Sequence, residues 1–435
     1  MLARLRLAWA RVRDSLWFLP GVLTLAGAVL AISVTQAEER GVFDVEMLRS
    51  WVFAGGVDGA RGVLSTIAGG LITVTGVVFS VTIVALQLAS TQFTPRILRN
   101  FTADRGNQLV LGVFIGTFTY TLLVLRTIRS AADGEDPFVP RVGVTLAVLL
   151  VLIAIGFLIF YINHSARSIQ VAAILDRVTR RTLGDVHRLF PGQTGHADDA
   201  EPPDPRPAGR PSVAVAADAA GYLQGVDGRG LFELGKARRL VIAMEPHVGD
   251  FILPGQPLAT VWPPDAADEA VCGHIRKAFL LGPERTSEQD VEFGIVEVSD
   301  IAIKALSPGI NDPTTAFHCI DRLSEILLAM GTRAAPSPRR TEQGQVHYLA
   351  RHPTFERAVG LSFDQIRHFG ASNPGIARKL LEVLTRLAAL VPPARRPVLL
   401  AQARAVLEDA RARMETAGDR EALEALAGRL FPASR

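Results

Sequence analysis

The sequence predicts an integral membrane protein with four transmembrane helices, followed by an α+β cytoplasmic region. Three observations support this fold class. Four long, uncharged, apolar runs all lie before residue 165 of the 435-residue chain, and each could span a bilayer. Short apolar runs between Gly and Pro turns then predict a small β-sandwich or barrel-like module. Apolar residues at helical spacing dominate the remainder and predict a mostly helical domain.

The predicted membrane domain covers residues 1–165. Its four spans lie at about 16–36, 63–90, 108–126 and 142–163. Several arginines precede the first span, as in a signal peptide, but its apolar part is long and no clear cleavage site follows it. We therefore interpret it as a retained span.

The placement of arginine predicts the orientation of the spans. Arginine precedes the first span and follows the second and the fourth, whereas the other two loops hold several acidic residues. By the positive-inside rule, both termini lie in the cytoplasm. Cys272 and Cys319 would then lie in a reducing compartment, which agrees with two unpaired thiols.

The second span carries a polar stripe, in which each member follows the last by seven residues. Its members are Thr66, Thr73, Ser80, Gln87 and Thr94. A seven-residue interval is close to two helical turns, so these side chains share one face with the small residues Gly69 and Gly76. The stripe has two open interpretations: it packs helices together, or it lines a water-filled path formed by several copies. Gln92, Arg96 and Arg99 would form the cytoplasmic mouth of such a path.

Beyond the spans, the chain divides into a connector, a linker and two domains. Residues 166–191 predict an amphipathic helix that joins the fourth span to the cytoplasmic region or lies on anionic headgroups. Residues 192–212 are rich in Pro, Asp and Gly and predict a linker. The small β-rich module covers 213–264, and the mostly helical cytoplasmic domain covers 265–435.

The β-rich module contains a turn at residues 248–258 that resembles the turn of biotinyl and lipoyl domains. Those carrier domains need a modified lysine shortly after the turn, and here no lysine follows. We therefore expect a structural or docking module rather than a carrier. A further strand is expected at 345–350, inside the helical domain.

The helical domain opens with a dense polar block. The candidate residues for a coupling element or subunit contact are Arg285, Gln289, Asp290, Asp300, Lys304, Ser307, Asn311, Asp312 and Thr315. The sequence holds no HExxH, GxSxG, Walker or dinucleotide-binding motif. We expect no enzyme, catalytic residue, metal or cofactor; a membrane-bound enzyme that uses this block stays an alternative.

Two runs of the chain resemble a known family. The residues STQFTPR at 90–96, and EQD at 288–290 followed by ALSPGINDPTTA at 305–316, resemble bacterial predicted membrane proteins of unknown function, domain of unknown function 2254. The resemblance extends from the spans to about residue 390. It implies a bacterial inner-membrane protein and brings no catalytic residues.

Two functions fit these observations. The first is a homo-oligomeric channel- or transporter-like protein, with the second span lining an axis for ions or small solutes and with a regulatory cytoplasmic domain. The alternative is a membrane-anchored scaffold or sensor that binds a partner or small ligand through its cytoplasmic domain. The expected partners are the lipid bilayer and further copies of the chain. A net charge of +3 and the lack of basic runs with aromatics argue against nucleic acid.

Overall fold

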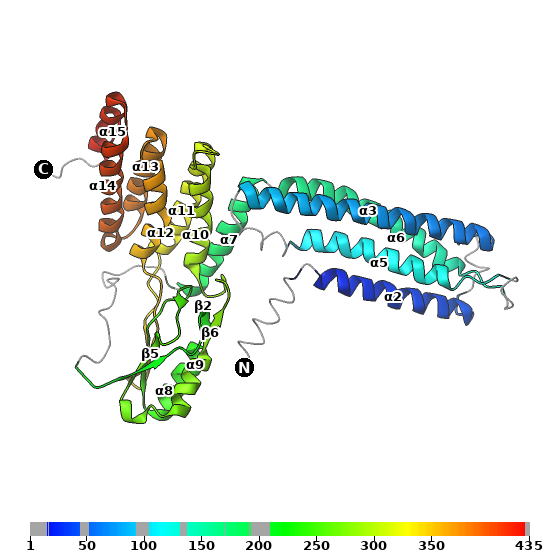
Figure 1. The fold of residues 1–435 in the computed structure, drawn as a ribbon, viewed down its shortest axis with the longest axis horizontal. Coiled ribbons are helices and arrows are strands. Elements are labelled where there is room, and N and C mark those ends of the chain that lie inside the picture. The colour runs from blue at the N-terminus through cyan, green and yellow to red at the C-terminus, as the bar shows by residue number, and fades with distance from the viewer. Residues whose placement is uncertain are drawn as a thin grey trace. The chain divides into compact units, whose positions relative to one another are not determined.

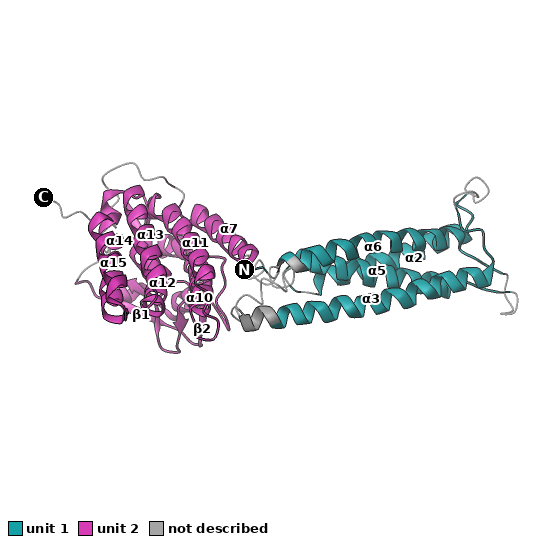
Figure 2. Ribbon diagram, turned by 90° about the horizontal axis from the view of Figure 1, so that it is seen from above, with its two compact units in different colours: residues 1–170 teal, residues 171–435 magenta. Residues whose placement is uncertain are grey.

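A computed structural model describes residues 15, 17–43, 52–92, 104–130, 137–168, 170–190, 192 and 209–430. The chain forms two compact units, residues 1–170 and 171–435 (Figure 2). The predicted linker at 192–212 falls mostly outside the described residues, as do Thr94, Arg96 and Arg99 of the stripe and mouth. Four apolar helices followed by a mixed region of helices and sheets confirm the coarse fold class.

The described part of the first unit consists of four helices that lie side by side (Figure 1). They are α2 (Phe18–Glu39), α3 (Val57–Gln92), α5 (Arg105–Arg126) and α6 (Arg141–Ser168). All four are long and apolar enough to cross a membrane. The helix α3 begins before its uncharged run, because Asp58 in its first turn interacts favourably with the positive end of the helix dipole.

The helix α5 is the centre of this unit. It contacts each of the other three helices, and 56% of its most apolar window is buried, against 22% for each of the others. Its backbone meets that of α2 where glycines face each other. A Cβ atom on Gly116 would lie 2.7 Å from the carbonyl oxygen of Leu23, and one on Gly27 would overlap the Gly116 carbonyl. Small residues therefore permit this close contact between helices.

Hydrogen bonds connect helices of the first unit. The hydroxyls of Thr82 and Tyr161 lie 2.7 Å apart, and Tyr161 donates to the Val78 carbonyl at 3.0 Å. The Glu38 carboxylate accepts from the Val142 N–H at 3.0 Å and so satisfies the start of α6. These bonds tie α3 to α6 and α2 to α6.

The second unit contains a helical layer. It is built from α7 (Val171–Leu189), α10 (Val291–Ala305), α11 (Pro313–Gly331), α12 (Phe355–Gly370), α13 (Pro374–Leu390), α14 (Arg396–Arg413) and α15 (Ala417–Leu430). The helix α7 buries Ile174, Leu175 and Val178 and contacts α10 and α11. The apolar face of the predicted connector is thus covered by protein within this unit.

Asx caps fix where these helices begin. Asp290 accepts from the Phe293 N–H at 3.0 Å, and Asp312 accepts from the Thr315 N–H at 3.1 Å. Asn373 caps α13 in the same way, with Pro374 in the first turn. Each side chain satisfies a backbone donor that the helix itself leaves open.

Two sheets complete the second unit. The five-stranded sheet has the order β1 (Val213–Ala216), β5 (Pro257–Trp262), β3 (Val241–Met244), β8 (Gln345–Leu349) and β7 (Arg339–Glu342). The three-stranded sheet has the order β4 (Phe251–Ile252), β2 (Gly221–Val226) and β6 (Phe279–Gly282). The helices α8 (Gly228–Arg238) and α9 (Glu269–Ala278) and the short turn η3 (Pro264–Ala266) lie between strands in sequence, and the short turn η4 (Pro393–Arg395) lies between α13 and α14.

Both sheets contribute to one hydrophobic core. Leu223 of β2 and Phe279 of β6 pack with Ile242 of β3 and Leu258 of β5. The expected strand at 345–350 is present as β8, which pairs in parallel with β3 through Ile242 and Tyr348. The β-rich region is therefore completed by strands from outside 213–264.

Candidate functional site

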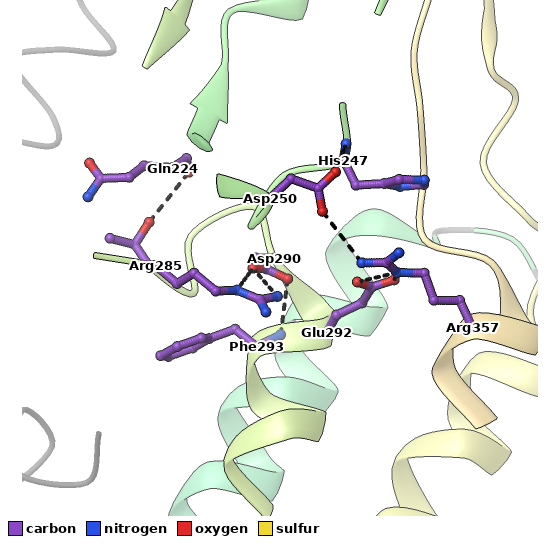
Figure 3. A network of polar contacts seen from close by, with 9 residues as sticks. Gln224, His247, Asp250, Arg285, Asp290, Glu292, Phe293 and Arg357 are labelled. Carbon is purple, nitrogen blue, oxygen red and sulfur yellow. Dashed lines mark hydrogen bonds and ion pairs between the residues drawn. The ribbon is translucent and has the colours of Figure 1, made fainter. Parts of the chain in front are cut away.

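The polar block at the start of α10 gathers around two ion pairs, which Figure 3 shows from close by. We call Asp250, Arg285, Asp290, Glu292 and Arg357 the Arg285 cluster. They come from the turn before β4, the loop before α10, the first turn of α10 and the first turn of α12. The cluster therefore joins the sheet region to the helical layer.

The first ion pair lies between Arg285 and Asp290. Two nitrogens of Arg285, Nε and one Nη, donate to the same Asp290 oxygen at 2.9 and 2.7 Å. The other Asp290 oxygen caps α10 through Phe293, and the guanidinium lies 5.7 Å from the centroid of the Phe293 ring. The Asp290 side chain is 1% exposed, so the pair is effectively buried. A carboxylate held from both sides fixes the path of the chain into α10.

The second ion pair is formed by Arg357 and Glu292, which is two residues after Asp290. Arg357 Nε lies 2.9 Å from both Glu292 oxygens, and another of its nitrogens lies 3.5 Å from Asp250. The Glu292 side chain is 3% exposed. Arg357 thus connects the start of α12 to α10 and to the turn before β4.

Gly249 allows the turn before β4 to approach the first pair. Its φ is +95°, and a Cβ atom there would overlap Asp290 Oδ2 and lie 2.6 Å from an Arg285 nitrogen. Only glycine combines this backbone conformation with that space. On either side of it, the Asp250 carboxylate accepts from the His247 N–H at 2.8 Å, which fixes the turn.

Burial dominates the titration of this region. It raises the pKa of Asp290 and of Glu292, and the neighbouring arginines offset part of that effect. Burial also lowers the pKa of His247 to about 4, and Arg351 and Arg357 add to the shift. His247 is therefore a neutral imidazole at neutral pH.

The structure divides the predicted polar block into two groups at opposite ends of α10. Arg285, Gln289 and Asp290 meet at its start, where the Gln289 amide accepts from the Val226 N–H of β2 at 3.0 Å. The remaining predicted residues lie at its end or in the turn into α11: Asp300, Lys304, Ser307, Asn311, Asp312 and Thr315. A helix of 15 residues separates these groups by about 20 Å.

The second group organises a helix–helix turn. Ser307 donates to the Lys304 carbonyl at 2.7 Å, Asn311 has a φ of +48°, and Asp312 binds the Thr315 hydroxyl at 2.6 Å. These contacts lie within the turn itself. They explain why residues with short polar side chains occur in this turn.

Sequence reasoning did not find His247, Asp250 or Arg357 as members of the site. Arg357 lies 65 positions from its partner Glu292, so no local pattern connects them. Gly249 and Asp250 both lie in the turn at 248–258, whose Gly-Asp sequence is typical of a tight turn. The likeness of this turn to carrier domains does not indicate an ion pair beside it. Another long-range pair, Arg181 of α7 with the buried Glu297 of α10, was also missed.

The polar stripe of α3 lies on the outer face of the first unit. Thr66, Thr73, Ser80 and Gln87 are exposed, and Leu64, Leu71 and Val78 are buried on the other side of the helix. Gly69, Gly70 and Gly76 have no atom within 4 Å of an added Cβ. Gln92 is the last residue of α3. Thr66, Thr73 and Ser80 thus face away from the described helices of this unit.

Candidate metal ligands and reactive thiols are few among the described residues. No group of three His, Cys, Asp or Glu side chains there could hold a metal ion. Burial raises the pKa of the Cys319 thiol far above its usual range, so this cysteine is not a thiolate nucleophile. The Arg285 cluster can hold three segments together, and the α3 stripe can offer hydroxyl groups to a neighbour.

Comparisons with known proteins identify one family and several uncharacterised relatives. The family described as "Predicted membrane protein (DUF2254)" matches residues 13–386. Uncharacterised proteins of Mycobacterium bovis and of two strains of Mycobacterium tuberculosis are 34% identical over 428 residues, which is 97% of this chain and 81% of theirs. No solved structure matches the chain.

Proposed function

Since the chain belongs to the DUF2254 family of predicted membrane proteins, we propose that it assembles with further copies of itself into a channel- or transporter-like protein of the bacterial inner membrane. In this proposal, the α3 helices of the copies surround a common axis along which ions or small solutes pass. The observation that carries it is the uncovered polar face of α3.

The first argument concerns the cost of leaving this face in lipid. Thr66, Thr73, Ser80 and Gln87 carry hydroxyl or amide groups on a face of α3 that is exposed among the described residues. Polar side chains of membrane helices usually face protein or water rather than hydrocarbon. Self-association removes the stripe from lipid without any change inside the four-helix unit.

The second argument concerns shape. Gly62, Gly69 and Gly76 follow one another at seven-residue intervals, four positions before Thr66, Thr73 and Ser80. Glycine and hydroxyl residues thus alternate along one face, at the spacings of three and four that permit close helix approach. The space around Gly69 and Gly76 is open to receive a neighbouring helix.

The third argument concerns the chemistry of the stripe. Thr66 and Thr73 donate to the carbonyls of Gly62 and Gly69 at 2.8 and 2.9 Å. A hydroxyl that donates its proton still has lone pairs to accept hydrogen bonds or to contact a cation. An axis lined this way presents oxygen acceptors along its length, with Gln92, Arg96 and Arg99 at the proposed cytoplasmic mouth.

In this proposal, both termini and the second unit lie in the cytoplasm, and the placement of arginine along the sequence supports this orientation. There the Arg285 cluster is a coupling element, because it ties the turn before β4 to α10 and α12. The regulatory role of this unit follows from its size and from its covalent connection to α6 through α7.

The alternative is a membrane-anchored scaffold or sensor. The same threonine bonds favour it, because hydroxyls satisfied within their own helix can serve packing alone. In that case the stripe joins copies together, and the cytoplasmic unit binds the partner or small ligand.

Flux through liposomes tests the proposal. We expect purified wild-type protein to pass ions or small solutes, and Thr73→Leu, Ser80→Leu and Gln87→Leu to change that flux because each adds apolar bulk to the axis. Val81→Leu is the control, since Val81 is exposed on another side of α3. Unchanged flux in all three stripe variants, or no flux from well-assembled protein, would favour the alternative.

A further inference from the structure

A hollow of about 540 Å³ lies in the second unit, where the helices α11 and α13 end. Its wall includes Arg333, Leu390, Val391, Pro392 and Arg396. This volume is in the range of pockets that hold small molecules, about 300–1,000 Å³. The hollow is separate from the Arg285 cluster and from α3, and the proposed function does not use it.

The two arginines of this hollow are held in place by backbone carbonyls. Arg333 donates to the Phe190 carbonyl at 2.9 Å, and Arg396 donates through Nε to the Val391 carbonyl at 3.4 Å. A guanidinium has five N–H donors, so these bonds occupy only part of each group. Each side chain is thus anchored and keeps donors for a ligand.

These arginines differ from several others in the unit, which are paired with carboxylates. Arg285, Arg357 and Arg367 all bind Asp or Glu side chains. None of the described residues that line the hollow is acidic. The hollow therefore holds two positive charges whose counter-charge is not supplied by its own wall.

Apart from Thr332, the rest of the wall is apolar. It includes Leu390, which is 55% exposed, and Pro392 two positions later. A small concave site with a few convergent charged groups on an apolar wall is typical of a binding pocket for an organic ligand.

We propose that this hollow binds a small dianion, a phosphate or a dicarboxylate, between the guanidinium groups of Arg333 and Arg396. Planar guanidinium groups suit phosphate and carboxylate oxygens, with which they form paired hydrogen bonds. The contacts with Leu390 and Pro392 accommodate a short carbon chain attached to the anion. The site gives the cytoplasmic unit a way to respond to a charged metabolite.

Calorimetric titration of the full-length protein in detergent tests this site, with inorganic phosphate and succinate as separate probes at constant ionic strength. We expect saturable binding of at least one probe. Arg396→Gln should weaken it by about tenfold or more, because it removes one of two charges and a hydrogen-bonding fork. Arg333→Lys should also weaken it, since lysine keeps the charge but not the fork.

Arg378→Gln is the matched control. Arg378 is an exposed arginine near the start of α13, whereas the hollow lies at the end of that helix. Its loss should leave binding unchanged and so separates a specific site from a general effect of charge. Absence of saturable binding for both probes would overturn the proposal. Equal weakening in Arg378→Gln and Arg396→Gln would overturn it as well, whatever the result of the flux assay.

Discussion

At the scale of single residues, the Arg285 cluster depends on the absence of a side chain at Gly249. The turn before β4 runs so close to Asp290 and Arg285 that an added methyl group has no space. Because Asp290 also caps α10, the position of this turn and the start of the helix are set together. The close packing of the sheet region against the start of α10 therefore depends on this one glycine.

The first prediction concerns Gly249→Ala. We expect it to destabilise the protein by about 3 kcal/mol or more, because it adds backbone strain and disrupts a buried ion pair. Gly255→Ala is the control: its φ of +85° imposes similar backbone strain, but nothing lies within 4 Å of its Cβ. It should cost about 1–2 kcal/mol. Chemical unfolding measures both, and equal losses would contradict the role given to the ion pair.

The second prediction concerns His247 and pH. Its folded pKa of about 4 lies below the unfolded value of about 6.5, so the unfolded chain binds more protons between these values. This contribution to stability is complete above about pH 6.5 and is lost as the pH falls towards 4. The raised pKa values of Asp290 and Glu292 act in the opposite direction.

A comparison with His247→Gln isolates the histidine, because the two carboxyl groups are present in both proteins. Between about pH 7 and pH 5, the melting temperature of the wild type should fall further than that of the variant. Parallel pH profiles would show that His247 is not buried in its neutral form.

The sequence identified part of this cluster. Arg285, Gln289 and Asp290 were found because they are close in the chain and precede an apolar helix. Arg357 and His247 were not found, because side chains meet across tens of positions only after the sheets and helices have packed. The same polar density placed Asp312 and Thr315 with Arg285, although a helix of 15 residues separates them.

At the scale of elements, α7 changes most between sequence and structure. Its pattern of basic and apolar residues predicted a connector that could lie on a membrane surface. In the structure, its apolar face is covered by α10 and α11, and Arg181 pairs with the buried Glu297. An amphipathic pattern specifies that one face is covered, but not whether protein or lipid covers it.

The third prediction follows from this packing. A fragment that begins at Val171 should fold in solution, whereas one that begins at Ser212 lacks α7 and should be less stable or aggregate. Without α7, apolar surface of α10 and α11 is exposed and Glu297 loses its arginine. Thermal unfolding and gel filtration of both fragments measure the difference. The same melting temperature and size behaviour in both would contradict it.

Hydropathy predicted the four apolar helices well, since an uncharged run of about 20 residues has few other stable structures. Their ends were less predictable: α3 starts at Val57 and includes Asp58 and Arg61, which the uncharged run excluded. The strand β8 was expected, but its parallel pairing with β3 was not, because strand partners are chosen by tertiary packing.

At the scale of the whole molecule, each unit presents one set of exposed polar groups. The first unit buries its own core around α5 and leaves the polar stripe of α3 uncovered. The second unit packs its sheets and helices around the Arg285 cluster and leaves two arginines in an open hollow. The account predicts that a copy of the chain covers the stripe and that an anion enters the hollow.

Self-association through α3 is the central claim, and a pair of adjacent glycines tests it most directly. Gly69 and Gly70 both have open space around them, but they point about 100° apart around the helix. Only Gly69 belongs to the row of Gly62, Gly69 and Gly76 that permits close helix approach, whereas Gly70 lies on the other side of the threonines. Leucine at either position adds the same bulk and the same gain in helix propensity, so the two variants differ only in direction.

The measurement is the subunit number of wild type, Gly69→Leu and Gly70→Leu in lipid nanodiscs, by native mass spectrometry. The account predicts that the wild type and Gly70→Leu form the same oligomer. Gly69→Leu should shift towards monomer, with an association weakened by about tenfold or more. A monomeric wild type, or an equal effect of both substitutions, would contradict it.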